Sequence, residues 1–425
     1  MTVEITTLDN GLRVASETMD HLETVAVGVW VDAGARHEAE AVNGVSHMLE
    51  HMAFKGTTRR SAQRIAEEIE AVGGHLNAYT SREQTAYYAR VLAGDLPLAV
   101  DLLGDILQHS VFEPTELERE RAVIIQEIGE AHDVPDDHLF DLLQEVAYPD
   151  QPMGRAILGT AERVRGFSRD TLAGYMAEHY HAPSMVLVAA GKLEHAAFVA
   201  LAADAFGGLG RQPSGDCLPG TFGGGERRAA RELEQVHLAL GFKGVSFADD
   251  DFYAAQVLST VLGGGMSLRL FQEIREKRGL AYSVYSFSSS FRDAGLFGVY
   301  AGTGPQQIGE LAPVLADEMM RLGEDVRPDE VARAGAQLKA GMLMALESPA
   351  SRCEQLARQL LIFGRPLTPA ELIEKIDAVD RAAVCAVARR ICRSGAPALA
   401  GLGPADSLGP AGGLEDYDVL AARFR

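Results

Sequence analysis

The pattern H-x-x-E-H at residues 47–51 constrains this chain more than any other stretch. It lies in the run 45–54, which has no glycine or proline and whose methionine and leucine residues favour a helix. Residues four apart in a helix share a face, so His47 and His51 point the same way. Two imidazoles so placed can bind one Zn²⁺, and the neighbouring Glu50 can take a proton from a metal-bound water. The pattern is typical of a zinc peptidase, although a surface helix with two histidines would also satisfy it.

Length and composition indicate a globular protein with more than one domain. The chain has 425 residues, which is too long for one hydrophobic core. Hydrophobic residues make up 47% and charged residues 23%, and no apolar run approaches the ~20 residues of a membrane span. The net charge of −21 argues against nucleic acid and anionic membranes as partners. It is compatible with a cavity that favours basic peptides, and equally with an acidic surface that only keeps the protein soluble.

The cysteines and the start of the chain bear on the cellular compartment in which the protein is expected. Four cysteines without a C-x-x-C pair suit reduced, structural thiols in a reducing environment. The first residues show no basic stretch followed by an apolar core, so we expect no secretory signal. We therefore expect a cytoplasmic protein, and a mature organellar protein without its targeting segment would look the same.

A glycine- and proline-rich stretch divides the chain. Between residues 206 and 225 these two residue types interrupt any regular pattern. We therefore expect a linker at 209–225, which separates a zinc-binding catalytic domain at 1–208 from a C-terminal domain at 226–425.

The second half of the chain repeats the first. The matching segments are 236–242 with 25–31, 263–275 with 44–54, and the strand and helix at 296–322 with those at 85–107. Histidine is absent from 263–275, so the second copy is expected to hold no metal. The order of elements predicts an α+β fold of two homologous domains, each a mostly antiparallel sheet flanked by helices.

A catalytic zinc ion needs one more protein ligand. Such sites have three protein ligands and a water, and no cysteine lies near the histidine pair. A long acidic helix expected from about residue 116 to 132 offers several carboxylates. The candidates are Glu113, Glu116, Glu118, Glu120, Glu127 and Glu130. Glu120 and Glu127 are seven apart and share a helical stripe, which favours these two but does not choose between them.

Five blocks of sequence resemble the pitrilysin-type, or inverzincin (M16), zinc metallopeptidases. They are most similar to the processing-peptidase branch, which includes the β subunit of mitochondrial processing peptidase. The blocks are 47–57, 73–80, 118–128, 154–160 and 275–284. Because they are spread over both halves, the resemblance covers nearly the whole chain.

The resemblance implies a role for each residue of the motif. It implies that Glu127, with His47 and His51, is a ligand of one Zn²⁺ per chain. It implies that Glu50 is the general base, and that Glu120 is a supporting acid near the histidines. A carboxylate in that place can accept a hydrogen bond from a ligand imidazole and so fix its orientation.

The resemblance also implies a place where the substrate binds. Asn77, Ala78 and Tyr79 match the family's exposed edge strand, which pairs with an extended peptide. Asn77 could equally be an ordinary turn residue before a strand. Phe54 is expected to pack beneath the zinc helix and to border the substrate.

Two further residues are assigned to the substrate by resemblance alone. Arg278 and Tyr282 match an arginine and tyrosine that the family brings to its cavity from the C-terminal portion. An arginine there can hold a peptide carbonyl, and a tyrosine can donate to the tetrahedral oxyanion. Without the resemblance, a surface arginine and a buried tyrosine would be the simpler interpretation.

These features together predict a zinc-dependent endopeptidase that hydrolyses peptides or unfolded presequence-like segments. By resemblance, one chain forms half of a clamshell, so we expect a homodimer that encloses a chamber, with a heterodimer as the alternative arrangement. The alternative function is a non-catalytic or heterodimer-dependent subunit that acts as a scaffold. An acidic binding protein with a chance motif is a third possibility, which the five blocks argue against.

Overall fold

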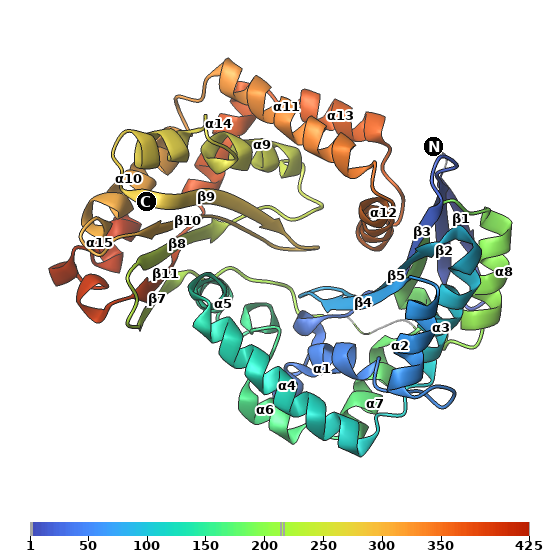
Figure 1. Cartoon of the computed structure of the whole chain (residues 1–425). Helices are drawn as coiled ribbons and strands as arrows, with labels where there is room; N and C mark the ends of the chain where they lie inside the picture. Colours follow the sequence, from blue (N-terminus) through green and yellow to red (C-terminus); the bar gives the residue numbers. More distant parts are fainter. Residues whose placement is uncertain (1–2, 213–214, 216, 425) are drawn as a thin grey trace. The chain divides into compact units, whose positions relative to one another are not determined.

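The computed structural model describes residues 3–212, 215 and 217–424, so residues 213, 214 and 216 of the expected linker lie outside the description. The chain folds into two compact units. The first comprises Met1–Gly129, Arg155–Leu218 and Leu343–Leu367, and the second comprises Glu130–Gly154, Pro219–Met342 and Thr368–Arg425. Figure 1 labels the helices and strands of both. No helix among the described residues is long and apolar enough to cross a membrane.

The first unit is built on a six-stranded sheet in the order β1-β2-β6-β3-β5-β4. The strands are β1 (Val3–Thr7), β2 (Arg13–Thr18), β3 (Thr24–Val31), β4 (His75–Thr80), β5 (Thr85–Leu92) and β6 (Met185–Gly191). All neighbours are antiparallel except β2 and β6. Because β3 and β6 lie inside the sheet and are covered on both faces, they read as continuous apolar runs.

Helices cover both faces of this first sheet. On one face, valines of β3 pack with leucines and Ile106 of α3 and with Met48 and Met52 of α1. On the other face, Ala26 and Trp30 of β3 pack against α12. The helices of the first unit are α1 (Val45–Met52), α2 (Ala62–Ala71), α3 (Leu96–Gln108), most of α4 (Pro114–Asp133), α6 (Ala161–Gly166), α7 (Arg169–His179), α8 (His195–Phe206) and α12 (Pro349–Phe363).

The second unit repeats the topology of the first. Its strands are β7 (Gly225–Ala230), β8 (Val236–Lys243), β9 (Ala281–Ser290), β10 (Gly295–Thr303) and β11 (Ala398–Gly403). The order β7-β11-β8-β10-β9 reproduces β2-β6-β3-β5-β4, with the same single parallel pair. The predicted α+β fold of two homologous domains is therefore confirmed.

The helices of the second unit show which of them corresponds to α1, and this differs from the prediction. They are α5 (Pro135–Ala147), α9 (Phe252–Gly263), the short π-helix η6 (Phe271–Glu276), α10 (Ile308–Arg321), α11 (Pro328–Ala345), α13 (Pro369–Asp377), α14 (Arg381–Cys392) and α15 (Tyr417–Ala422). Between β8 and β9 come α9 and then η6, just as α1 and α2 come between β3 and β4. The counterpart of α1 is therefore α9, and the expectation that 263–275 takes its place is wrong.

The segment 263–275 begins at the glycines that end α9. Gly44 precedes α1, but Gly264 is the residue that ends α9, and glycine is common at both ends of helices. The sequence of α9 also contains no histidine, so the second unit still lacks the paired imidazoles of the first.

The two units are not simply the two halves of the chain. Helix α5, from the first half, packs on β8 and β11 of the second sheet. Helix α12, from the second half, packs on β3 and β6 of the first sheet. The domain limits expected from the sequence stay a prediction, and the compact units differ from them in these two helical segments.

A buried ion pair fastens α12 to the first sheet. The Arg352 guanidinium of α12 donates to the Glu17 carboxylate of β2, and both side chains are buried. Nearby, Arg13 donates to the carbonyl of Leu360 at 2.7 Å. A buried pair is costly to break because the remaining charge has no partner.

We expect Arg352→Leu to lower the free energy of unfolding by about 3–5 kcal/mol, because it leaves the Glu17 carboxylate buried and uncompensated. Urea unfolding followed by circular dichroism measures the loss. The double variant Glu17→Leu with Arg352→Leu removes both charges and should recover most of it. A double variant as unstable as Arg352→Leu would show that the pair is not the origin of the effect.

Candidate metal centre

A buried carboxylate holds the start of α1, the helix that carries the H-x-x-E-H pattern. Gly44 precedes the helix with φ of 99° and has no side chain to cap it. Glu38 supplies the acceptors instead: its Oε2 accepts from the Gly44 N–H at 2.7 Å and its Oε1 accepts from the Ser46 N–H at 2.8 Å. A carboxylate there satisfies free N–H groups and suits the positive end of the helix dipole.

Sequence reasoning missed Glu38. The available signal was that Gly44, directly before the helix, cannot cap it, so that an acceptor had to come from elsewhere in the chain.

The block 154–160 contacts the same end of α1. Gly159 has φ of 71°, and a Cβ on it would meet the Asn43 carbonyl oxygen at 2.4 Å. Asn43 in turn donates to the Ala156 carbonyl at 3.0 Å. Only glycine allows this close approach, so the block 154–160 fixes where α1 begins.

The face of α1 opposite the core carries the pattern. Val45, Met48, Leu49 and Met52 are buried in the core of the first unit. The pattern residues His47, Glu50 and His51 are only partly buried. The apolar residues thus anchor the helix and leave the histidine face free for chemistry.

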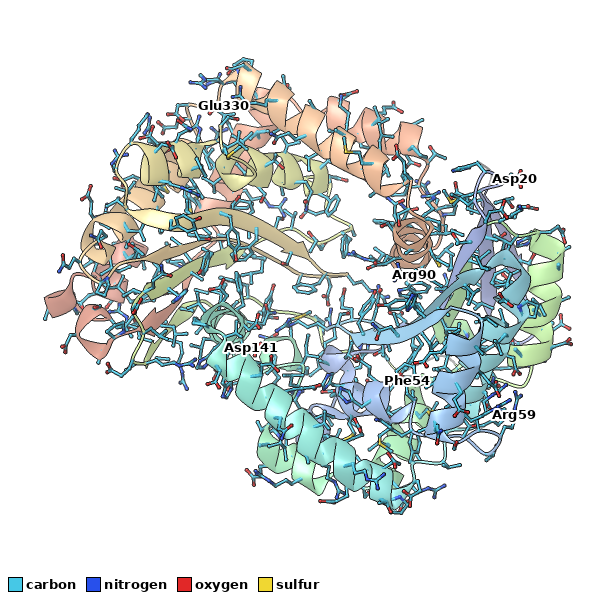
Figure 2. All side chains as sticks on the ribbon, in the orientation of Figure 1. Asp20, Phe54, Arg59, Arg90, Asp141 and Glu330 are labelled. Carbon is cyan, nitrogen blue, oxygen red and sulfur yellow. The ribbon has the colours of Figure 1, made fainter. Side chains whose placement is uncertain are left out.

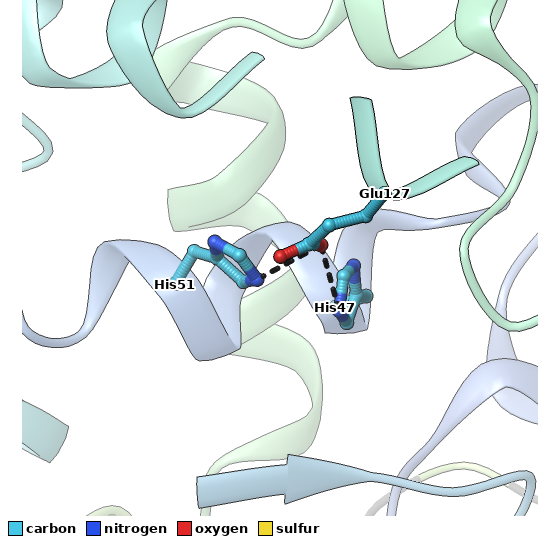
Figure 3. Close-up of side chains that lie close together, drawn as sticks. All are labelled: His47, His51 and Glu127. Carbon is cyan, nitrogen blue, oxygen red and sulfur yellow. Dashed lines mark ion pairs between the residues drawn. The ribbon is translucent and has the colours of Figure 1, made fainter. Parts of the chain in front are cut away.

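His47, His51 and Glu127 converge on one point. One ligand atom from each lies within 4.8 Å of the other two, and among the described residues no other group of this kind is found. The Glu127 Oε2 lies 3.4 Å from His51 Nε2 and 3.7 Å from His47 Nε2 (Figure 3). These distances are too long for good hydrogen bonds. Tetrahedral ligands at about 2.0–2.2 Å from a zinc ion are separated by about 3.4 Å, and the two distances from Glu127 are close to this value.

Two polar atoms of this cluster have no partner within the described part of the chain. They are Glu127 Oε2 and His47 Nδ1, and both are buried. Burial also lowers the pKa of His47 to about 4, with the neighbouring His51 adding to the effect. His47 is therefore neutral at pH 7, which is the form that binds a metal. The donor set and its spacing fit a divalent cation.

Glu120 lies behind His51 and is 5% exposed. Its Oε2 is 2.9 Å from His51 Nδ1, and its Oε1 is 2.8 Å from the Lys55 ammonium. Glu120 and Glu127 project from the same side of α4, with Ile124 buried between them, as the stripe predicts. A His51 imidazole that donates through Nδ1 presents Nε2 to Glu127.

Glu50 is held beside the cluster by the edge strand β4. Its Oε2 accepts a hydrogen bond from the Thr80 hydroxyl of β4 at 2.7 Å. Burial raises the pKa of Glu50, and the nearby Glu127 charge acts in the same direction, while Thr80 opposes the rise. A carboxylate with a raised pKa is better matched to taking up and releasing a proton near neutral pH. Thr80 was not singled out from the sequence, although the alternation of β4 places it on the same face as Ala78.

The expected substrate residues lie on an edge strand. β4 pairs with β5 alone among the described strands. Asn77 is exposed, and its Oδ1 accepts from the Ala78 N–H at 2.8 Å. Ala78 is buried towards α1, whereas Tyr79 packs on the opposite face, where the Trp30 indole donates to its hydroxyl at 3.1 Å. The side chains therefore face both ways, and what the three residues share is their place in the edge strand of the sheet.

Phe54 lies just after α1 (Figure 2). It is partly buried against the core of the first unit. It also lines a cavity of about 530 Å³, together with residues of α2 and β4 that include Ile65, Ile69 and Leu76. Both expectations for Phe54 are compatible with this position.

Arg278 and Tyr282 belong to the second unit and are described within it alone. Arg278 donates to the backbone oxygen and to the carboxylate of Glu273, both at 2.8 Å. Tyr282 is the second residue of the edge strand β9 and is 75% exposed, so the simpler interpretation of a buried tyrosine is wrong. The Arg275 guanidinium lies 4.5 Å from the centre of its ring. Their expected role at the substrate stays a prediction.

A two-sheet α+β fold with a paired-histidine and glutamate cluster defines a class of metallopeptidases. Residues 13–161 match the model of the insulinase family (peptidase family M16), and residues 166–338 match that of the M16 inactive domain. An uncharacterized zinc protease of Rickettsia bellii is 38% identical, over 92% of this chain and 95% of its own. The mitochondrial-processing peptidase subunit beta of Mus musculus is 40% identical, over 99% of this chain and 87% of its own.

A solved structure agrees with this result. A protease from Helicobacter pylori superposes with a TM-score of 0.87 at 22% identity, over 95% of this chain and 100% of its own. The fold is therefore shared, and the relatives at higher identity decide the family. The chain belongs to peptidase family M16.

We expect Glu38→Gln to destabilise the protein by about 1–3 kcal/mol, because an amide can turn an N–H toward the donors of Gly44 and Ser46 and satisfies them less well. Thermal and urea unfolding of the metal-free protein measure the change. The matched control is Glu40→Gln, which removes an exposed carboxylate 3.0 Å from Arg163. The control should cost less than about 1 kcal/mol, and equal losses in both variants would contradict the capping role.

Proposed function

We propose that the protein is a zinc-dependent endopeptidase that hydrolyses peptides or unfolded presequence-like segments. The observation that carries the proposal is the convergence of His47, His51 and Glu127, with the Glu127 Oε2 at 3.4 Å and 3.7 Å from the two imidazole nitrogens. The names of the relatives, zinc protease and processing peptidase, support the same chemistry. One Zn²⁺ per chain is proposed, because the described residues contain one such cluster.

The cluster and the two glutamates beside it, Glu50 and Glu120, have separate parts in this reaction. A zinc ion bound there would supply Lewis acidity and a water of lowered pKa. Glu50 takes the proton from the attacking water and passes it to the leaving amine. Glu120 keeps His51 oriented through its Nδ1.

The edge strand β4 is the proposed place where the peptide lies. Its free backbone groups can pair with an extended chain, and Thr80 at its end holds Glu50. Asn77, Ala78 and Tyr79 would thus run beside the substrate, and Phe54 would border a side-chain cavity. Arg278 and Tyr282 are proposed to contact the peptide as well. The net charge of −21 favours basic peptides.

We also propose the state in which the protein works. It would act as a homodimer that encloses a peptide chamber, in the cytoplasm. Cys353, Cys385 and Cys392 are buried free thiols, which suits a reducing compartment. The similar mouse protein is named a subunit, so the second candidate is a subunit that needs a different partner chain. The mass of the purified active species, alone and after mixing with candidate partners, separates the two.

The first test is a fluorogenic peptide panel with zinc content measured in parallel. Glu50→Gln should keep stoichiometric zinc and lose nearly all turnover, because the base is lost and the ligands remain. Glu127→Gln should lose zinc affinity along with activity. Equal turnover in wild type and Glu50→Gln would refute the assigned base. Stoichiometric zinc without cleavage of any peptide would favour the scaffold alternative.

A second test uses the single tryptophan of the chain. Trp30 donates to the hydroxyl of Tyr79 in β4, so a peptide that pairs with this strand should change the tryptophan emission. Titration of Glu50→Gln with an uncleaved peptide should give a saturable change. Tyr79→Phe removes the bonded hydroxyl and should reduce the change without abolishing binding. Binding detected by calorimetry, with tryptophan emission unaltered in both proteins, would place the peptide elsewhere.

A further inference from the structure

Lys55 follows α1 and is held by its surroundings. Its backbone N–H donates to the Met52 carbonyl at 3.2 Å, which closes the turn at the end of the helix. The next residue, Gly56, has φ of 116°, and this conformation turns the chain. The Lys55 ammonium lies 2.8 Å from Glu120 Oε1, and its side chain is 30% exposed.

A buried aspartate fixes the loop that contains Lys55. The Asp105 Oδ2 on α3 accepts from the Thr57 hydroxyl at 2.8 Å and from the Arg60 guanidinium at 2.7 Å. The Asp105 side chain is fully buried. The loop that follows Lys55 is therefore fixed to α3 through Thr57 and Arg60.

The two oxygens of Glu120 have separate partners. Oε2 faces His51 Nδ1 and Oε1 faces Lys55, and the described residues provide this carboxylate with no other partner. Without Lys55, one oxygen of a nearly buried carboxylate would lack a donor. The carboxylate could then rotate, and the bond that orients His51 would be shared between two oxygens.

We propose that Lys55 is a positioning residue for the metal site. It holds the Glu120 carboxylate in one orientation, so that His51 donates through Nδ1 and presents Nε2 to the ion. The contacts would then run from the metal through His51 and Glu120 to Lys55. This inference rests on the proposed zinc function.

The competing role for Lys55 is direct contact with substrate. Lys55 lines the same cavity as Phe54, so its charge could meet a peptide carboxylate there. The two roles predict different measurements. Positioning changes the affinity for zinc, whereas substrate contact changes KM when zinc is saturating.

The experiment measures the Zn²⁺ dissociation constant by competition with a chelator, for the full chain. Lys55→Met should weaken zinc binding at least about tenfold, as expected for loss of a group that supports a ligand. Lys55→Arg keeps a donor and should recover most of the affinity. The matched control, Lys192→Met, removes a lysine paired with exposed Glu23 and should bind zinc as wild type does.

A double-mutant cycle tests whether Lys55 acts through Glu120. Adding Lys55→Met to Glu120→Gln should change zinc affinity no further, because the carboxylate that Lys55 positions is already absent. Unfolding of the metal-free variants separates a loss of stability from a loss of zinc affinity. Wild-type zinc affinity in Lys55→Met overturns the proposal, and so do additive effects in the cycle or a change in KM alone. A wild-type chain that binds no zinc would instead overturn the proposed function on which this inference rests.

Discussion

The metal site depends on the approach of one carboxylate to two imidazoles. The Glu127 carboxylate of α4 approaches two imidazoles of α1 at distances that are too long for hydrogen bonds and that suit a shared metal ion. The buried Oε2 of Glu127 has no hydrogen-bond donor among the described residues, and an unsatisfied buried oxygen costs free energy. A divalent cation would remove that cost, and the surrounding structure holds the three residues ready for it.

Much of the first unit serves to place α1. Glu38 holds its first N–H groups, and Gly159 permits the close approach of the neighbouring loop. At the other end, Lys55 and Glu120 hold His51 from behind. Between these ends the apolar side chains of the helix are buried in the core. The histidine pair is thus fixed at both ends and along its length, as a preorganised site requires.

The sequence predicted the local features better than the long-range ones. The helix with its histidine pair and the stripe that joins Glu120 to Glu127 followed from periodicity alone. The choice of Glu127 as the residue facing both histidines needed a family resemblance, because helical spacing treats the two glutamates alike. Glu38 and Lys55 could not be found, because their partners depend on how loops fold back on α1.

The second half shows the same limits of pattern reasoning. The repeat of strands was predicted, and the order of the second sheet confirms it. The position of the α1 counterpart was misjudged, because the segment 263–275 begins at the glycines that end α9. The sequence also did not predict that α5, from the first half, packs on the second sheet and that α12, from the second half, packs on the first. Each helix has an ordinary amphipathic pattern, which does not specify the sheet on which it packs.

The two units share one topology, and only the first has the ligand cluster among the described residues. The chemistry therefore follows from a few side chains placed on a common scaffold. X-ray absorption at the zinc edge of the purified protein tests this account most directly. We expect two imidazole nitrogens and carboxylate or water oxygens at about 2.0–2.2 Å, with the shell altered in Glu127→Gln. A zinc shell that is the same in wild type and Glu127→Gln, or that contains sulfur, would contradict the account.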